Sequence, residues 1–192
     1  MDSQKAEIIF KKEKIRKEII RLLQGMDSLA KKGNDLKIQE KVLSSKEFNK
    51  SDTVMTYVSL PSEVDTWGII KEALKRGKRV VVPFLGGDKK QIIASKLSSI
   101  ECMKNGPFDI FQPENGWTDR VPLEEIDLIL VPAIAFDSRN MRLGRGKGYY
   151  DKFLSQKELS SVTAIGLAYN FQVLKNLPSD VHDKSVLRVI TN

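Results

Sequence analysis

The sequence predicts an α/β fold: a three-layer sandwich whose largely parallel central sheet is covered by helices on both faces. Short apolar runs, such as IDLILV at residues 126–131, alternate with amphipathic segments along the chain. These runs have no polar face, which is typical of strands that are buried on both sides in a parallel sheet. The 192 residues are 41% hydrophobic, enough for the core of a single domain spanning residues 1–192.

Four helices are expected. In the first, apolar residues recur three, four or seven positions apart, at Ile8, Ile15, Ile19, Leu22 and Met26. The second is predicted over residues 34–47, with Leu36, Val42 and Leu43 facing inward. The third is predicted over 66–76, with Asp65 or Thr66 as its N-cap and Gly77 at its end. The fourth is predicted over 151–159.

Six strands are expected, at residues 53–58, 79–82, 91–95, 126–131, 162–168 and 186–190. The second of them is expected to stop at Pro83, because proline has no N–H to donate to a sheet. Residues 104–122 contain Pro107, Pro113 and Pro122 and are predicted to form a long irregular connection.

Residues 142–151, RLGRGKGYYD, form the most distinctive motif of the chain. Glycines let backbone amides approach a ligand closely and adopt positive φ without strain. The arginine and lysine side chains between them suit phosphate or carboxylate groups. We therefore predict an anion-binding loop that leads into a helix. The motif fits neither the P-loop nor the G-x-G-x-x-G dinucleotide pattern, and a glycine-rich turn with incidental charges is the alternative.

Three polar loops are expected to meet at one edge of the sheet, since ligands of such folds bind beyond the carboxyl ends of the strands. The glycine-rich motif follows strand 126–131, Glu63 follows strand 53–58, and Asp183 precedes the last strand. Asp151 and Asp183 are candidate ligands of Mg²⁺, which prefers oxygen. The alternatives are stabilisation of a helix N-terminus by Asp151 and a turn at Asp183. For Glu63 the alternative is a solvated residue in a helix-capping loop.

The composition limits the function further. The net charge of +7 is spread along the chain, which suits an anionic small molecule and argues against a nucleic-acid partner. A single cysteine, Cys102, excludes an internal disulfide, and we expect it to be buried. The single histidine, His182, is expected to be exposed. Trp117 is either a lid or stacking residue or a loop anchor. The sequence shows no apolar run of 18 residues and no signal peptide, so a cytoplasmic protein with no membrane partner is expected.

The stretch 126–154 closely resembles the signature of the 5-formyltetrahydrofolate cyclo-ligase family, also called 5,10-methenyltetrahydrofolate synthetases. Other family features follow in the same order: a K-x-x-x-R helix at Lys12 and Arg16, an S-x-x-x-E-V-D-T segment around Glu63, and a late Leu-Pro…His-Asp segment at 177–183. From the residues alone, Lys12 and Arg16 are more typical of a solvated helix face. The resemblance implies ATP- and magnesium-dependent cyclisation of 5-formyltetrahydrofolate to 5,10-methenyltetrahydrofolate, with release of ADP and phosphate.

The resemblance also implies roles for individual residues. ATP would be bound by Lys12, Arg16, Arg142, Leu143, Gly144, Arg145, Gly146, Lys147, Gly148, Tyr149 and Tyr150. The folate would be bound by Val58, Glu63, Arg145, Gly146, Lys147, Gly148 and Tyr149, and magnesium by Asp151 and Asp183. Lys147 and Arg145, at the centre of the loop, are our candidates for contact with the transferred phosphoryl group.

One position departs from the family pattern, which commonly has a glycine just before the first arginine of the motif. Here Asn140 stands near that place, and asparagine tolerates positive φ better than most residues, so we expect the turn to be kept. A monomer is expected. Two other functions remain open: a kinase for another pterin or small metabolite, and a non-catalytic protein that binds nucleotides or RNA.

Overall fold

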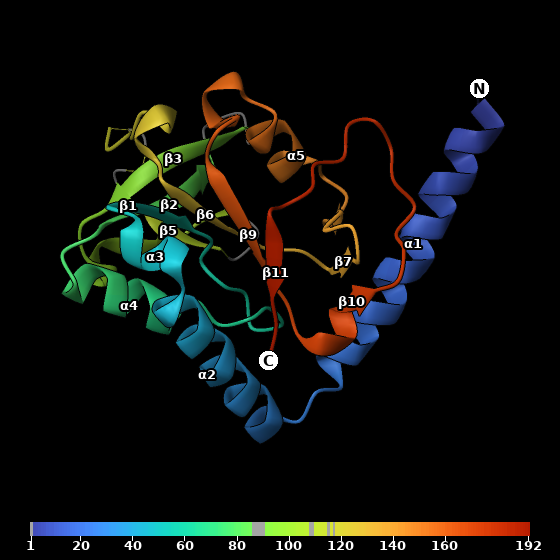
Figure 1. Ribbon diagram of the computed structural model, residues 1–192, viewed down its shortest axis with the longest axis horizontal. Coiled ribbons are helices and arrows are strands. Elements are labelled where there is room, and N and C mark those ends of the chain that lie inside the picture. Colours follow the sequence, from blue (N-terminus) through green and yellow to red (C-terminus); the bar gives the residue numbers. More distant parts are fainter. Residues whose placement is uncertain (1, 86–90, 108–109, 115, 117) are drawn as a thin grey trace.

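The computed structural model describes residues 2–85, 91–107, 110–114, 116 and 118–192 (Figure 1). Its centre is a six-stranded sheet with the order β11-β9-β6-β1-β2-β3. Five strands are parallel, and β3 pairs antiparallel with β2 at the edge. The strands are β1 (Thr53–Thr56), β2 (Arg79–Leu85), β3 (Ile92–Leu97), β6 (Leu128–Val131), β9 (Thr163–Leu167) and β11 (Arg188–Ile190). The predicted α/β class and largely parallel sheet are confirmed.

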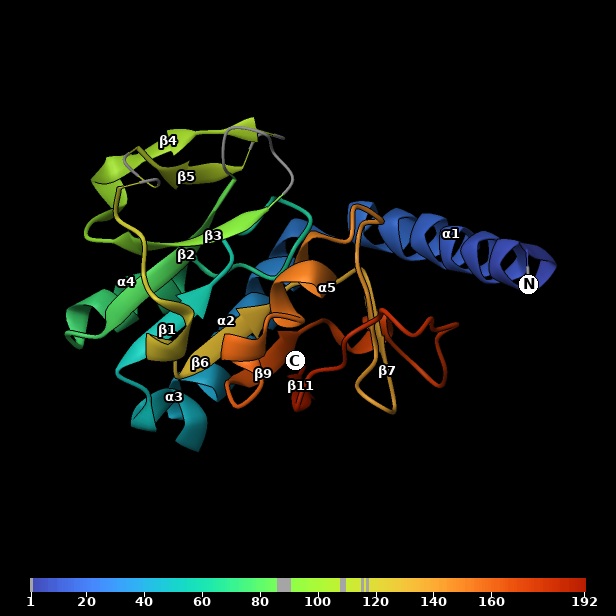
Figure 2. The ribbon, with the colours of Figure 1, turned by 90° about the horizontal axis from the view of Figure 1, so that it is seen from above.

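Helices cover both faces of this sheet. Because successive residues of a strand point to opposite faces, each strand contributes side chains to two cores. Val54 and Leu128 pack in one core with α2 (Ser28–Ser44), α3 (Lys46–Lys50), α4 (Trp67–Lys75) and the C-terminal half of α1 (Asp2–Gln24). Met55 and Ile129 pack in the other core with α5 (Tyr149–Leu154) and a short 3₁₀ turn at Lys157–Leu159. The N-terminal end of α1 extends beyond the sheet (Figure 2).

The helix predictions need three corrections of detail. The second helix begins at Ser28 instead of 34, because the Asp27 carboxylate caps it by accepting hydrogen bonds from the N–H groups of Leu29 and Ala30. Leu36 is exposed and Ile38 is buried in its place, and in α1 Leu23 is buried while Leu22 is exposed. The predicted helix 151–159 begins at Tyr149 and ends at Leu154, and a separate 3₁₀ turn follows it.

The N-cap of α4 is Thr66, one of the two predicted residues, but its side chain makes no capping bond. The Thr66 hydroxyl instead donates to the Tyr57 carbonyl, and the Asp65 carboxylate accepts the Trp67 N–H. Both residues therefore tie the helix start to the loop after β1.

Strand β2 does not stop at Pro83 as predicted, but continues to Leu85. The pairs of β2 with β1 end at Val81, so Pro83 lies where only the edge strand β3 is paired with it. A missing N–H is tolerated at such a position.

Residues 104–122 are not wholly irregular, because β4 (Met103–Asn105) and β5 (Phe111–Pro113) pair antiparallel. Cys102 precedes this pair and is exposed, contrary to the expected burial. Trp117 lies outside the described residues.

A second, three-stranded sheet was not predicted from the sequence. It consists of β10 (Val173–Leu174), β7 (Ala135–Asp137) and β8 (Arg142–Leu143), in that order. Asn140 joins β7 to β8 with φ of 60°, as its tolerance of positive φ led us to expect. This hairpin carries the glycine-rich loop at its end and so sets where the loop leaves the sheet.

Candidate active site

The glycine-rich loop connects β8 to the N-terminus of α5, as predicted. Gly146 and Gly148 have φ of 97° and 68°, a backbone region that residues other than glycine and asparagine rarely adopt. Gly148 is the residue that caps α5. The loop therefore depends on glycine at these two positions to turn into the helix.

Helix α1 holds the loop from outside. The Arg16 Nε donates to the Gly144 carbonyl at 2.9 Å, and the Lys12 ammonium pairs with the Asp183 carboxylate. The side chains of Lys12 and Arg16 are only 12% and 16% exposed. These residues are therefore not a solvated helix face: Arg16 contacts the loop, and Lys12 contacts the segment around Asp183.

Arg142 is buried below the loop with 5% of its surface exposed. Its Nη2 lies 2.6 Å from Asp151 Oδ1, and its guanidinium lies 5.7 Å from the centre of the Tyr150 ring. The N–H of Lys184 also donates to Asp151 Oδ1, at 3.4 Å. The segment around Asp183 thus meets the start of α5.

The loop after β1 reaches the same place through Glu63. Arg145 donates to Glu63 Oε1 from Nη2 at 3.1 Å and from Nε at 3.3 Å, while Glu63 Oε2 accepts the Leu60 N–H at 3.0 Å. The Glu63 side chain is 14% exposed and is therefore not the solvated residue of the alternative reading. The predicted meeting of three polar loops is confirmed.

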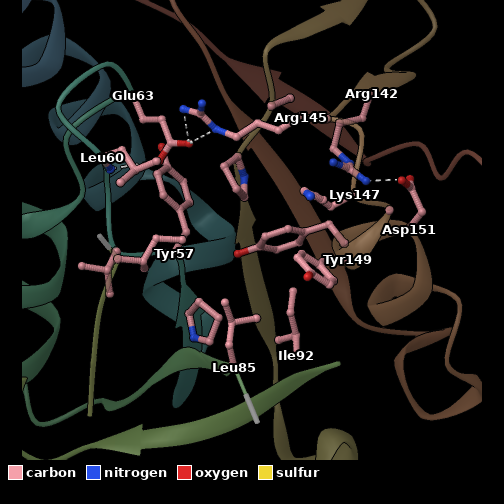
Figure 3. Close-up of a pocket in the computed structure, with 18 of the residues that line it drawn as sticks. Tyr57, Leu60, Glu63, Leu85, Ile92, Arg142, Arg145, Lys147, Tyr149 and Asp151 are labelled. Carbon is pink, nitrogen blue, oxygen red and sulfur yellow. Dashed lines mark hydrogen bonds and ion pairs between the residues drawn. The ribbon is translucent and has the colours of Figure 1, made fainter. Parts of the chain in front are cut away.

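A cavity of about 340 Å³ lies between these loops (Figure 3). Its charged side carries the Arg145–Glu63 and Arg142–Asp151 ion pairs together with Lys147, and its opposite side is apolar, with Leu85 and Ile92. Further lining residues are Tyr57, Val58, Leu60, Pro83, Ile110, Gln112, Pro132, Ala133, Gly144, Gly148, Tyr149 and Tyr150. An amphipathic ligand with one charged end fits such a lining.

Two polar atoms at this cavity are buried without a hydrogen-bond partner among the described residues: Arg142 Nε and the Tyr150 hydroxyl. Burial raises the pKa of Tyr150, the nearby Glu63 charge raises it further, and Arg142 opposes the shift. Burial likewise raises the pKa of Tyr57 well above its ordinary value. The Tyr150 hydroxyl therefore keeps its proton at neutral pH and is available as a donor, whereas the Tyr57 hydroxyl already donates to the Val64 carbonyl. Buried donors normally have partners, so an acceptor atom from a ligand fits here.

The model of the 5-formyltetrahydrofolate cyclo-ligase family matches residues 8–192. The chain belongs to this family. It is similar to the 5-formyltetrahydrofolate cyclo-ligase of Haemophilus influenzae, with 27% identity over 94% of this chain and 97% of the relative. It is also similar to that of Mus musculus, with 29% identity over 93% and 92%. The solved structure of 5,10-methenyltetrahydrofolate synthetase from Aquifex aeolicus superposes with a TM-score of 0.82, at 33% identity, over 93% of this chain and 88% of that chain. Members of the cyclo-ligase family are ligases, so this chain is an enzyme.

Most residues that the resemblance to the cyclo-ligase family singled out surround the cavity. Five of them do not line it. Leu143 is buried in the core at 2% exposure, and Gly146 faces Arg16. Lys12, Arg16 and Asp183 stand behind the loop instead of in the cavity wall. His182 is exposed, as expected.

Tyr57 and the apolar side of the cavity were not predicted from the sequence. Leu85 and Ile92 belong to β2 and β3 and look like ordinary core residues in the sequence, so no local signal marks them. Tyr57 follows β1 directly, and only its place at the carboxyl end of a strand could have indicated it.

Within the described residues, no helix is long and apolar enough to cross a membrane, and no group of three or more histidine, cysteine or acidic side chains is arranged to hold a metal ion.

Proposed function

We propose that the protein uses ATP to cyclise 5-formyltetrahydrofolate to 5,10-methenyltetrahydrofolate, releasing ADP and phosphate. Membership of the cyclo-ligase family supports the reaction. The observation that carries the assignment to this cavity is the pair of buried donors, Arg142 Nε and the Tyr150 hydroxyl, which have no protein partner among the described residues. They lie on the charged side of a cavity whose other side is apolar.

The two ligands would divide the cavity. The pterin ring, flat and rich in N–H groups, suits the region between the Glu63 carboxylate and the apolar residues Leu85 and Ile92. The phosphates suit the glycine-rich loop, with Arg142, Arg145 and Lys147 around it. Lys12 and Arg16 would approach the phosphates from behind the loop.

The chemistry explains this need for positive charge. The formyl oxygen is a poor leaving group, so it first attacks the γ-phosphorus of ATP, and ADP departs. N10 then attacks the carbon of the resulting imidate phosphate and releases its proton, the ring closes, and phosphate leaves with the former formyl oxygen. Catalysis of phosphoryl transfer rests on positioning and on neutralising charge more than on covalent help from the protein. Arg145 and Lys147, at the centre of the loop, are the proposed contacts of the transferred group.

Asp151 and Asp183 fit a magnesium ion in their donor chemistry. Each has one oxygen engaged by a cation, Arg142 for Asp151 and Lys12 for Asp183. The other carboxylate oxygen of each has no hydrogen-bond partner among the described residues. Mg²⁺ is commonly held by one or two carboxylates together with substrate phosphates and water. When bound, it would neutralise charge on the phosphates.

The direct test is to mix the protein with 5-formyltetrahydrofolate, ATP and Mg²⁺ and to follow the absorbance of the methenyl product. Product that requires all three components supports the proposal. ATP consumption with another pterin and no methenyl product would point to a kinase. RNA binding that weakens steeply with salt, without ATP consumption, would point to a binding protein.

A further inference from the structure

The loop that presents Glu63 is fixed from below by a buried carboxylate outside the cavity. Asp35 on α2 is 6% exposed, although aspartate is seldom buried unless it is paired. Its Oδ1 accepts the Asp65 N–H at 3.1 Å and the Tyr169 hydroxyl at 2.7 Å. Its Oδ2 pairs with Lys31 at 2.8 Å. The Asp35 carboxylate thus joins α2 to the loop after β1 and to the segment after β9.

Tyr169 extends this connection to Glu63 itself. It is 1% exposed, its ring stacks on Phe171, and its hydroxyl lies 3.3 Å from the Glu63 carbonyl as well as near Asp35. Burial and the Asp35 carboxylate both raise the pKa of Tyr169, so the hydroxyl remains a donor at neutral pH. One phenolic proton therefore lies between the Asp35 carboxylate and the backbone of Glu63.

These bonds act on both sides of Val64. Asp35 holds the N–H of Asp65, Tyr169 contacts the carbonyl of Glu63, and the Tyr57 hydroxyl donates to the Val64 carbonyl at 3.0 Å. The Glu63 carboxylate can point into the cavity only if its backbone stays in this place. Neither Asp35 nor Tyr169 lines the cavity, and the loop of Glu63 is the cavity element that both of them contact.

We propose that Asp35 and Tyr169 are positioning residues for Glu63, and that they set the affinity for the folate and not that for the nucleotide. The inference rests on the proposed function, in which Glu63 accepts hydrogen bonds from the pterin. The bonds from Asp35 and Tyr169 act directly on the loop of Glu63, whereas the glycine-rich loop has its own support from Arg16 in addition to the Arg145–Glu63 ion pair. Displacement of a binding group by a fraction of an ångström is enough to weaken recognition.

The test is steady-state kinetics with both substrates. Tyr169→Phe removes only the hydroxyl, and we expect it to raise KM for 5-formyltetrahydrofolate about tenfold, the scale of one hydrogen bond to a charged group. KM for ATP should stay within about twofold. Asp35→Ala should have a larger effect on the folate KM, and Asp35→Asn, which keeps one acceptor oxygen, should fall between. Lys31→Gln is the matched control, because it removes the surface partner of Asp35 and leaves the loop bonds in place.

A double-mutant cycle separates positioning from general loss of stability. In a Glu63→Gln background, Tyr169→Phe should leave the folate KM unchanged, because the side chain it positions is already altered. Additive effects, or equal increases in both KM values, would overturn the inference, as would an unchanged folate KM in Tyr169→Phe and Asp35→Asn. If Tyr169→Phe does not fold, the same cycle is run with Asp35→Asn. Absence of methenyl product with the wild-type protein would overturn the proposed function, and the inference with it.

Discussion

Lys147 sits in the middle of the glycine-rich loop, with its side chain exposed at the cavity. In the proposed reaction it faces the transferred phosphoryl group, and removal of one preorganised charge of this kind typically costs about 10²-fold in turnover. We expect Lys147→Ala to lower kcat by about that factor and to leave the melting temperature almost unchanged. Lys152→Ala is the control, since Lys152 is an exposed residue of α5 outside the cavity. A kcat equal to that of the wild type would remove Lys147 from the mechanism.

Glu63 belongs to the folate half of the proposed site. Glu63→Gln keeps the shape of the side chain but loses the charge that pairs with Arg145 and that, in the proposed function, would accept pterin N–H groups. We expect KM for 5-formyltetrahydrofolate to rise about tenfold, with a smaller change in KM for ATP. Both constants can be measured by methenyl absorbance. A response in ATP binding alone would contradict the role of Glu63.

At the scale of elements, the small sheet depends on one buried carboxylate. Asp137, at the end of β7, is 1% exposed and accepts the N–H groups of Arg139, Met141 and Leu177 as well as the Arg139 guanidinium. Burial opposes the ionisation of Asp137, but these hydrogen bonds, led by the one from Leu177, outweigh it and lower its pKa. Asp137 therefore holds the hairpin that leads to the glycine-rich loop.

Because the pKa of Asp137 is lower in the folded than in the unfolded protein, its stabilisation is fully present above the unfolded value of about 3.9 and is lost as pH falls through the folded value. We expect Asp137→Asn to reduce the free energy of unfolding by about 2 kcal/mol at pH 7. The difference from the wild type should shrink below about pH 4. Urea unfolding across this pH range measures it, with the exposed Asp119→Asn as control. A difference that is constant down to pH 2 would be inconsistent with an ionised Asp137.

The elements that could be predicted from the sequence are those with a long local signal. The apolar run 126–131 indicates a buried strand, and the amphipathic segment that ends at Gly77 indicates a helix. The strands β7, β8 and β10 have only two or three residues each, too few to show a period, so tertiary contacts alone define them. The effect of Pro83 was predicted wrongly, because a proline is tolerated in β2 only where the pairing with β1 has already ended, and the sequence does not show where that is.

The site was predictable to a different degree. Three glycines among cations marked the loop, but the contact between Glu63 and Arg145 spans 82 positions and leaves no pattern in either segment. For Lys12 and Arg16 the local pattern favoured solvent, and only the family resemblance indicated otherwise. Asp35 and Tyr169 lie 134 positions apart and meet only in the fold.

At the scale of the whole molecule, one core joins the first and last elements: Ile19 of α1 and Ile190 of β11 belong to the same cluster. We therefore expect thermal unfolding in one cooperative transition, in keeping with a single domain over residues 1–192.

ATP with Mg²⁺ at about a hundred times its Kd should raise the melting temperature by on the order of 5 °C. ATP with a chelator should raise the melting temperature much less. Phosphates that bind Arg142 and Lys12 would break their ion pairs with Asp151 and Asp183, and without Mg²⁺ these two carboxylates would have no cation beside them. Equal shifts would argue against a magnesium site at these carboxylates.

The Arg145–Glu63 ion pair has a consequence for the order of events. Both oxygens of Glu63 are engaged before any ligand arrives, one by Arg145 and the other by the Leu60 N–H. In the proposed function the Arg145 guanidinium lies between the two ligands, and it cannot pair fully with both Glu63 and the nucleotide phosphates at the same time. A nucleotide that attracts Arg145 releases the carboxylate for the pterin, and by thermodynamic reciprocity each substrate then strengthens the binding of the other by the same factor. The ion pair would lower the affinity of the empty protein for either substrate alone, and the affinity for each substrate would rise once the other is bound.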